Sequence, residues 1–333
     1  MTLAEYGKIF CHLSFWSILG TLSRMSLTKL TNYQGSYIHS ADSNSCLWSN
    51  FAACFIISAV ANSTSFWYEL VETETEQVKD THRAKAKTEL LLYVGLTTGY
   101  CGSLSTFSSL IVEAFNKALD ASRELPNHGY GTMEFASVIL VQLGVSVLAW
   151  KLGHDLVIGL EQFHAIKMPS SWVAPLEVAI GILGVCLIIV MVVLAAALPG
   201  WWRPWAASCC FAPLAVMLRF ELARNLNSRS WFPWGTLAAN TIACVVIGIA
   251  LLASRGLRVH NSHAACVALV AIENGFSGVL STTSTFVAEF EKLQGKRRHI
   301  YAFTSVAVCT TCVLLTFGVY AWSTGVRSAI CHY

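Results

Sequence analysis

Two stretches of the chain decide the fold: GYCGSLSTFSSL at residues 99–110 and GFSGVLSTTSTF at residues 275–286. Seven of the twelve aligned positions are identical or exchange serine for threonine, which unrelated apolar helices would not give. Each stretch places two glycines three residues apart and follows them with serines and threonines. Because glycine weakens a helix and serine and threonine compete for its hydrogen bonds, both stretches predict helices that break partway along.

The composition indicates that both breaks lie in a membrane. Hydrophobic residues make up 55% of the chain and charged residues 12%, about half the charged share of soluble proteins. The net charge of +3 is too small to indicate a nucleic-acid partner. The 12 cysteines are scattered, mostly through apolar runs, which favours small buried hydrophobes over a zinc site or a disulfide framework.

The expected fold class is an all-α membrane protein with about nine transmembrane helices, because a bilayer core takes about 20 apolar residues per helix. The charged stretch 69–89 is expected to be a solvated loop. The nine expected spans are 9–29, 47–68, 90–112, 133–153, 173–198, 205–223, 234–253, 264–288 and 301–323.

Spans 1–4 match spans 6–9, which predicts two four-helix repeats. The single fifth span between them inverts the second repeat relative to the first, and such repeats place a site near the midplane. The fifth span itself is expected to be a linker helix that sets orientation. The expected domains are a first repeat at 1–168, the linker helix at 169–200 and a second, inverted repeat at 201–333.

Polar residues recur at matching positions of the two repeats. Arg24 aligns with Arg219, and charges at such positions are expensive in lipid unless they serve a site; an arginine that reaches out to the interface is the alternative. Asn50 aligns with Asn240, and both amides need protein or a water-filled cavity to satisfy them; simple contacts between helices are the alternative.

The distribution of lysine and arginine predicts the orientation. The side that holds the N-terminus carries 13 of these residues and the opposite side carries 7. Positive residues favour the cytoplasmic side, so we expect a cytoplasmic N-terminus and an extracellular C-terminus in the plasma membrane. On that topology Asn62, in an Asn-Ser-Thr sequon, should stay unmodified.

The doubled pattern, with the upstream asparagine and the earlier arginine, resembles the Fluc/FEX fluoride channels over essentially the whole chain. The bacterial channels are four-span subunits that pair antiparallel, and the eukaryotic exporters fuse two such units through an extra helix. The chain is similar to the fused kind, which implies that it works as a monomer in the lipid bilayer.

The resemblance implies two narrow pores lined by phenylalanines whose ring edges, the positive part of the aromatic quadrupole, face the anion. The family motif has two phenylalanines three residues apart. This chain has Phe107 and Leu110 in the first half, and Thr283 and Phe286 in the second. Each pore takes one phenylalanine of each kind from opposite halves, so we expect one working pore with Phe107 and Phe286 and one vestigial pore.

Further site residues follow from the same resemblance. The arginines of the vestibule would be Arg24 and Arg219. A structural Na⁺ would be held by the backbone carbonyls of Gly102, Ser105, Gly278 and Ser281. The chain departs from the family pattern at Ala53, Ala215 and Ala243, where the family has glycine. The expected fluoride-contacting residues are Phe107, Phe286, Asn50, Asn240, Thr106, Ser108, Ser284 and Thr285.

The expected function is passive export of fluoride, with an ion-coupled anion antiporter as the alternative. The sequence has no Walker A loop, and we expect no buried Asp/Glu relay of the kind that proton-coupled exchangers use. An intramembrane enzyme is excluded because His12, His154 and His263 show no catalytic or metal-ligand spacing. Fluoride is strongly hydrated, so a pore must replace its water with amide, hydroxyl and aromatic-edge donors.

Overall fold

The computed structural model describes residues 2–33, 45–63, 66–67, 90–119, 127, 129–163, 170–197, 199–200, 202–255 and 262–324. Within these ranges all regular structure is helical, which confirms the all-α class. The helices before the linker are α1 (Leu3–Thr31), α2 (Leu47–Asn62), α5 (Leu91–Val94), the π-helix η1 (Gly95–Cys101), α6 (Gly102–Leu104), α7 (Phe107–Ala118) and α8 (Tyr130–Phe163).

The second part of the chain repeats this order after α9 (Val173–Ala197), the helix expected to be a linker. The short 3₁₀ turns Ser170–Trp172 and Asn227–Arg229 precede α9 and follow α10. The later helices are α10 (Trp202–Leu226), α11 (Trp234–Ser254), α12 (His263–Ala271), the π-helix η4 (Ile272–Ser277), α13 (Gly278–Leu280), α14 (Thr283–Lys292), α15 (Lys296–Val313), the π-helix η5 (Leu314–Gly318) and α16 (Val319–Thr324).

Both predicted breaks are present and have the same geometry. Ser105 and Thr106 are extended between α6 and α7, with ψ angles of 158° and 127°. Ser281 and Thr282 are extended between α13 and α14, with ψ angles of 151° and 126°. The side chain of each threonine then caps the next helix by accepting a backbone N–H, so the chain resumes its helix at once.

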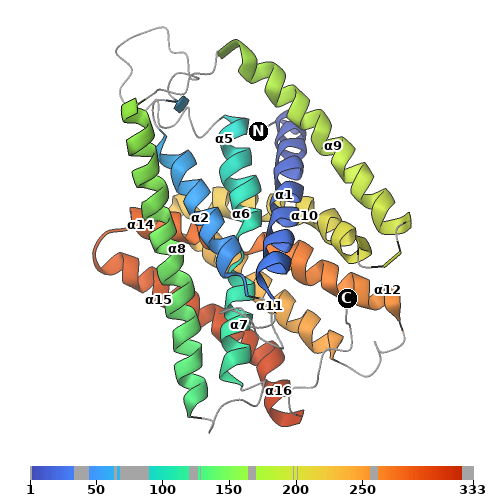
Figure 1. Ribbon diagram of the computed structural model, residues 1–333, viewed down its shortest axis with the longest axis vertical. Helices are drawn as coiled ribbons and strands as arrows, with labels where there is room; N and C mark the ends of the chain where they lie inside the picture. Colours follow the sequence, from blue (N-terminus) through green and yellow to red (C-terminus); the bar gives the residue numbers. More distant parts are fainter. Residues whose placement is uncertain are drawn as a thin grey trace.

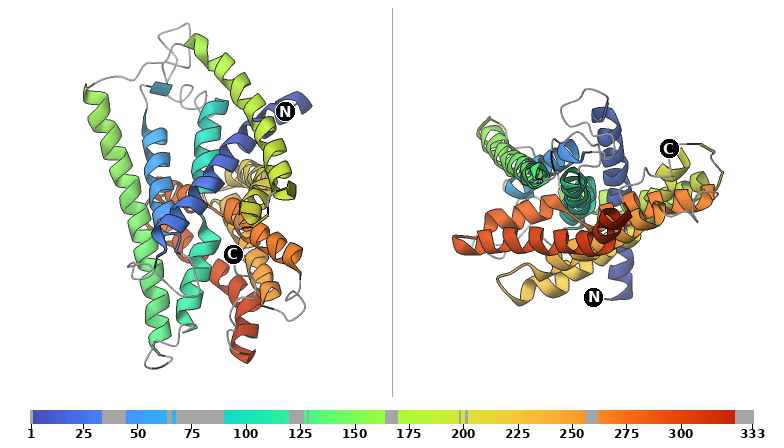
Figure 2. Two further views of the ribbon diagram at one scale, coloured as in Figure 1. Left: turned by 45° about the vertical axis from the view of Figure 1, so that its right-hand side comes forward. Right: turned by 90° about the horizontal axis from the view of Figure 1, so that it is seen from below.

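The two broken segments cross near the middle of the molecule. Figure 1 shows α5–α7 running along the long axis while α12–α14 runs across it. The other helices surround this crossing: α2 packs on α8, α10 packs on α1 and α11, and α15 packs on α11 and α7. Figure 2 shows α9 and α8 on opposite flanks, and α8 packs on α7 and α14 while α9 packs on α1 and α10.

The outer surface is apolar, as a bilayer requires. On α9, Val178 and Ile182 are 63% and 60% exposed, and Phe303 on α15 is 76% exposed. A water-exposed surface of this kind would aggregate, whereas lipid covers it without cost. The polar side chains instead lie inside, where the serines and threonines of both breaks are fully buried.

Among the described residues, six helices are long and apolar enough to cross a membrane, compared with about nine expected spans. The other three expected spans coincide with helical segments that fail on length or polarity. Helix α2 has 16 residues, a rise of about 24 Å, and α5–α7 carries many glycines, serines and threonines between residues 95 and 109. Helix α1 buries polar side chains such as His12 and Arg24 on one face. The charged stretch 69–89 lies outside the described residues.

Helix α9 packs against α1 through a close backbone approach. A Cβ added at Gly184 would collide with the carbonyl oxygen of Cys11, and with the amide of Phe15 at 3.3 Å. A Cβ at Gly181, one turn earlier, would meet only Cys11 and His12 side-chain atoms at 3.9 Å. The two glycines therefore differ in whether the helices can tolerate a methyl group.

We expect Gly184→Ala to destabilise the protein by about 1–3 kcal/mol, because the added methyl group forces α9 away from α1. Gly181→Ala should be neutral or slightly stabilising, since alanine is the better helix former. The measurement is thermal unfolding of the purified protein in detergent. Equal unfolding temperatures for the two variants would contradict this packing.

Candidate functional site

A cluster of buried hydroxyl groups joins the two breaks across a local twofold pattern. The Ser105 hydroxyl donates to the Ser284 hydroxyl at 2.9 Å, and the Ser281 and Ser108 hydroxyls pair at the same distance. Ser105 also pairs with Thr282 at 3.2 Å, and Ser281 with Thr106 at 3.1 Å. All six side chains are at most 1% exposed. The two halves therefore satisfy each other's polar groups reciprocally.

The two aligned asparagines hold the breaks by matching contacts. The Asn50 side-chain oxygen accepts the Thr106 N–H at 2.8 Å, and Asn240 accepts the Thr282 N–H at 2.8 Å. Each amide group also donates to the carbonyl of the same threonine, at 3.2 and 3.4 Å. Both asparagines are fully buried. These contacts place Asn50 and Asn240 at equivalent points of the two halves.

The two aligned arginines lie at the centre and bridge the halves. The Arg24 guanidinium donates to the carbonyls of Ser103 at 2.9 Å and Gly278 at 2.5 Å, and to that of Asn274. Both side chains are nearly inaccessible, at 4% and 3% exposed. Each arginine therefore binds carbonyls that the broken helices leave free.

The second arginine repeats this pattern in the opposite direction. Arg219 donates to the carbonyls of Gly102 at 2.9 Å and Thr98 at 2.5 Å, which belong to the first half. It also donates to the carbonyl of Val279 in its own half. The tight fit extends to the glycines, because a Cβ at Gly278 would lie 2.7 Å from an Arg24 nitrogen.

The four carbonyls expected to hold Na⁺ are brought to the same crossing. Carbonyl oxygens are the hard ligands that such a cation prefers, and both serines are extended, which frees their carbonyls from the helix. The carbonyls of Gly102 and Gly278 each accept one guanidinium N–H. A carbonyl oxygen has two lone pairs, so the carbonyls of Gly102 and Gly278 each keep one acceptor position beside the guanidinium N–H.

The two retained phenylalanines meet in the core. The ring centroids of Phe107 and Phe286 are 5.2 Å apart, with the rings tilted by 50°. The side chains are 0% and 2% exposed. The ring of Tyr301 lies 5.0 Å from that of Phe286. Three aromatic rings therefore form a row that starts beside the first break.

At two positions this chain lacks the phenylalanine of the family motif, and the residues found there have different surroundings. Leu110 is completely buried in the same apolar cluster as the two phenylalanines. The Thr283 hydroxyl donates to the Thr106 carbonyl at 3.1 Å, so it adds a further link between the halves. Thr285 lies at the edge of the cluster, where its hydroxyl accepts from Thr282 at 3.2 Å.

Two acidic side chains that the sequence analysis did not name lie inside the helix bundle. Glu113 is 7% exposed and accepts from the Gln142 amide at 2.5 Å. Glu289 occupies the equivalent position and accepts from Tyr301 at 2.6 Å and Thr236 at 2.7 Å. The repeat, continued six residues beyond Phe107 and Thr283, aligns these two glutamates and would have found them.

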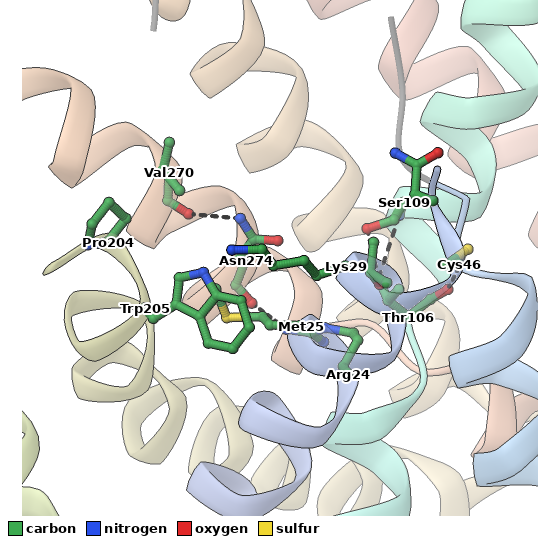
Figure 3. A pocket seen from close by; sticks show the side chains of 12 residues that line it. Arg24, Met25, Lys29, Cys46, Thr106, Ser109, Pro204, Trp205, Val270 and Asn274 are labelled. Atoms are coloured by element: carbon green, nitrogen blue, oxygen red, sulfur yellow. Dashed lines mark hydrogen bonds between the residues drawn. The ribbon is translucent and has the colours of Figure 1, made fainter. Parts of the chain in front are cut away.

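One polar cavity of about 340 Å³ reaches the first break. Figure 3 shows Arg24 and Lys29 of α1 and Asn274 of η4 beside it. Thr106 and Ser109, at the start of α7, form another part of its wall. Two of the described lining residues are cationic and none is acidic. The full lining comprises Arg24, Met25, Thr28, Lys29, Asn32, Cys46, Thr106, Ser109, Pro204, Trp205, Val270 and Asn274.

Comparison with known proteins supports the repeat. The profile of the CrcB-like protein family (Camphor Resistance, CrcB) matches twice, at residues 11–154 and 206–319. Fluoride export protein 1 of Candida albicans is 33% identical over 96% of this chain and 82% of its own length. Fluoride export protein 1 of Saccharomyces cerevisiae is 30% identical over 99% of this chain and 97% of its own.

A bacterial relative covers a smaller part of the chain. The fluoride-specific ion channel FluC of Bordetella pertussis is 44% identical over 80 residues, which is 23% of this chain and 57% of that protein. No solved structure matches.

We expect Ser281→Ala to destabilise the protein more than Ser105→Ala. The Ser281 hydroxyl accepts the N–H groups of Phe107 and Ser108, at 3.2 and 3.1 Å, whereas Ser105 accepts that of Ser284 alone, at 3.0 Å. Each buried N–H left without an acceptor costs about 1–3 kcal/mol. Thermal unfolding measures the difference, with the exposed Ser137→Ala as control. A larger loss for Ser105→Ala would contradict the assignment.

Proposed function

Since this chain belongs to the CrcB-like protein family, we propose that it is a passive channel that exports fluoride through one working pore. The chain is a multi-pass membrane protein, and its family places it among membrane transport proteins rather than enzymes. The observation that carries the proposal is the doubled break, beside which the buried Phe107 and Phe286 rings meet.

The arrangement supports selection of fluoride by hydrogen-bond donors that would contact the anion directly. The cavity brings water to Thr106 and Ser109, whose hydroxyls lie 3.1 Å apart, next to Phe107. Fluoride loses its hydration shell only where hydroxyl, amide and aromatic-edge donors replace it. Asn50 positions the Thr106 backbone at this point by its two hydrogen bonds. A larger, weakly hydrated anion such as chloride gains less from these donors in so narrow a passage.

The second pore is proposed to be vestigial. Its two aromatic positions hold Leu110 and Thr283, and the Thr283 hydroxyl is committed to the Thr106 carbonyl at 3.1 Å. Leucine offers no positive ring edge to an anion. The loss of both rings therefore falls on the same pore, while the other retains both.

The proposed topology has nine membrane-crossing segments in two inverted repeats, with a cytoplasmic N-terminus and an extracellular C-terminus. The two family matches flank α9, which supports its role as the linker that inverts the second repeat. Because the two halves are fused, one chain contains both breaks. A single chain in the plasma membrane would therefore suffice to form the channel. A membrane potential that is negative inside drives an anion outward with about 2.3 kcal/mol per 100 mV.

A structural sodium ion at the crossing is part of the proposal. Carbonyls of Gly102, Ser105, Gly278 and Ser281 would hold it, and it would supply positive charge that neutralises the carbonyl dipoles of both breaks. The arginines share this role, because they already bind two of the four carbonyls.

Glu113, which is buried, and Glu289, which is partly buried, favour a second candidate, an ion-coupled anion antiporter. Glu113 and Glu289 lie at equivalent positions, as paired carboxylates do in proton-coupled carriers. Both, however, are hydrogen-bonded within local clusters that contain Gln142 or Tyr301. The channel remains the preferred function because an antiporter would need both carboxylates to exchange ions with water.

Fluoride release from liposomes that contain the purified protein tests the function. We expect rapid release when a potassium ionophore sets the potential, with little chloride release and no dependence on a proton gradient. Replacing sodium with N-methylglucamine should lower the release rate if the crossing needs Na⁺. Slow release that requires an opposing ion gradient would replace the channel with the antiporter.

We expect Phe107→Ile and Phe286→Ile each to lower fluoride release by about tenfold, the factor that corresponds to losing an aromatic contact of about 1.4 kcal/mol. The matched controls are Leu110→Ile and Thr283→Ser, at the same positions of the other half. These substitutions should leave the rate of fluoride release within about twofold, because neither removes an aromatic contact of about 1.4 kcal/mol. Loss of release in the controls alone would assign conduction to the other pore.

A further inference from the structure

A mostly apolar cavity of about 520 Å³ lies between α1, α5 and α9, apart from the crossing of the two breaks. We propose that this cavity binds a membrane phospholipid whose head group carries both a phosphate and a primary ammonium, with Lys8 holding the phosphate and Glu177 the ammonium. Such a site goes beyond the proposed channel function and does not depend on it. It gives a role to Glu177, the one charged residue of the linker helix α9.

The cavity lies near one end of three helices. Its wall contains Leu91, the first residue of α5, and Ala174, the second residue of α9. Figure 1 shows that α1, α5 and α9 all start toward the upper end of the molecule. Glycines leave the cavity open: a Cβ added at Gly7 would meet no atom within 4 Å, and one at Gly181 would meet only side-chain atoms at 3.9 Å. Cavities of this size and apolar character are typical of small-molecule sites.

Two opposite charges line this cavity where the helices enter the membrane. Lys8 directly precedes the first expected span at 9–29, and Glu177 lies four residues after the start of the fifth at 173–198. Both therefore lie near the head-group region, which borders the hydrocarbon core. Among the ion pairs of the described residues, none joins Lys8 to Glu177. Two opposite charges that share a cavity without pairing favour a ligand that carries both signs.

The backbone at Glu177 and its carboxylate are both fixed by hydrogen bonds. Its backbone carbonyl accepts from Nε2 of the buried His12 at 2.6 Å, and its Oε1 atom accepts the Leu92 N–H at 3.3 Å. An ionised carboxylate has about four lone-pair sites, so acceptor capacity remains for a ligand. A primary ammonium supplies three N–H donors, whereas a quaternary ammonium supplies none. The position beside Glu177 therefore favours a primary amine over a choline group.

Lys8 suits a phosphate, and the wall that α9 supplies suits an acyl chain. Lys8 is exposed, and an ammonium group forms charge-assisted hydrogen bonds with phosphate oxygens. Val178, Ile182 and Val185 line the cavity and follow Glu177 along α9, over a rise of about 12 Å. All three are exposed apolar side chains. A phospholipid presents its charged head group and its chain in this same order, so one molecule can contact every part of the cavity.

Native mass spectrometry of the purified protein in detergent, with three added lipids, tests the site. Dioleoyl phosphatidylethanolamine, phosphatidylcholine and phosphatidylglycerol have the same chains and the same phosphate, and they differ in the group beyond it. We expect one molecule of the ethanolamine lipid to bind about threefold more tightly than either of the others, the ordinary effect of one exposed ion pair. Equal affinities for the three lipids would overturn the proposal.

Charge substitutions separate a binding role from a structural one. Glu177→Gln should weaken the ethanolamine lipid about threefold and strengthen the glycerol lipid, because it removes the partner of the ammonium and the repulsion of a net negative head group. Lys8→Gln should weaken all three lipids, since each carries a phosphate, and Lys8→Arg should retain them. Loss of a merely structural contact would weaken the three lipids alike, so equal losses in Glu177→Gln contradict the assignment.

Filling the cavity tests the place of the acyl chain. We expect Gly181→Leu to lower the affinity for all three lipids about tenfold, the factor for displacing about two methylene groups. The matched control is Gly144→Leu on α8, outside the cavity, where an added Cβ meets no atom within 4 Å. Its lipid affinities should be unchanged, and the unfolding temperatures of all variants show that they fold.

Lipid affinity is measured without fluoride, so the two proposals fail separately. A protein that prefers the ethanolamine lipid but releases no fluoride loses the channel function and keeps this site. Unchanged lipid affinities in Gly181→Leu overturn the site, whatever the protein conducts.

Discussion

The structure depends on one constraint: a helix that breaks inside a membrane frees backbone groups that lipid cannot satisfy. Here the two breaks cross and satisfy each other. Arg24 reaches from the first half to the Gly278 carbonyl, and Arg219 reaches back to that of Gly102. Since each half supplies the donors that the other lacks, neither break is tolerable alone. The fused chain delivers both halves in equal number.

The same constraint distinguishes the residues that hold the structure together from those that a passing anion could contact. The hydroxyls of Ser105 and Ser281 are saturated by contacts between the halves, at 2.9–3.2 Å. Groups so engaged hold the crossing rigid and are costly to recruit for a passing anion. A partly exposed hydroxyl, that of Ser109, lies beside the crossing at the cavity wall. An anion path that skirts the centre therefore leaves the structural hydrogen bonds intact.

The sequence predicted the features that two halves repeat. The glycine and serine pattern indicated both breaks, and the alignment of Asn50 with Asn240 is matched by identical 2.8 Å contacts to Thr106 and Thr282. The reach of the arginines was not predictable, because it depends on how two segments 170 or more residues apart cross. Among the described residues six helices are long and apolar enough to cross a membrane, and the expected spans at α1, α2 and α5–α7 are helical but shorter or more polar.

Glu113 and Glu289 escaped notice for a different reason. Single acidic residues at the ends of apolar runs look like solvated boundaries, and only the continued repeat aligns them. Their burial follows from tertiary partners, Gln142 in one half and Tyr301 in the other, which no local pattern encodes.

The two halves differ in sequence at some positions and not at others, and the pattern depends on whether a position contacts both breaks. Positions at the crossing serve both breaks, and there the halves are identical: Ser105 with Ser281, and Thr106 with Thr282. At the two phenylalanine positions, which the proposed pores do not share, the halves differ. A substitution at the crossing leaves buried groups of both halves unsatisfied, whereas replacing one ring by Thr283 even adds a hydrogen bond to the scaffold. The proposed loss of one pore is therefore compatible with an intact crossing of the two breaks.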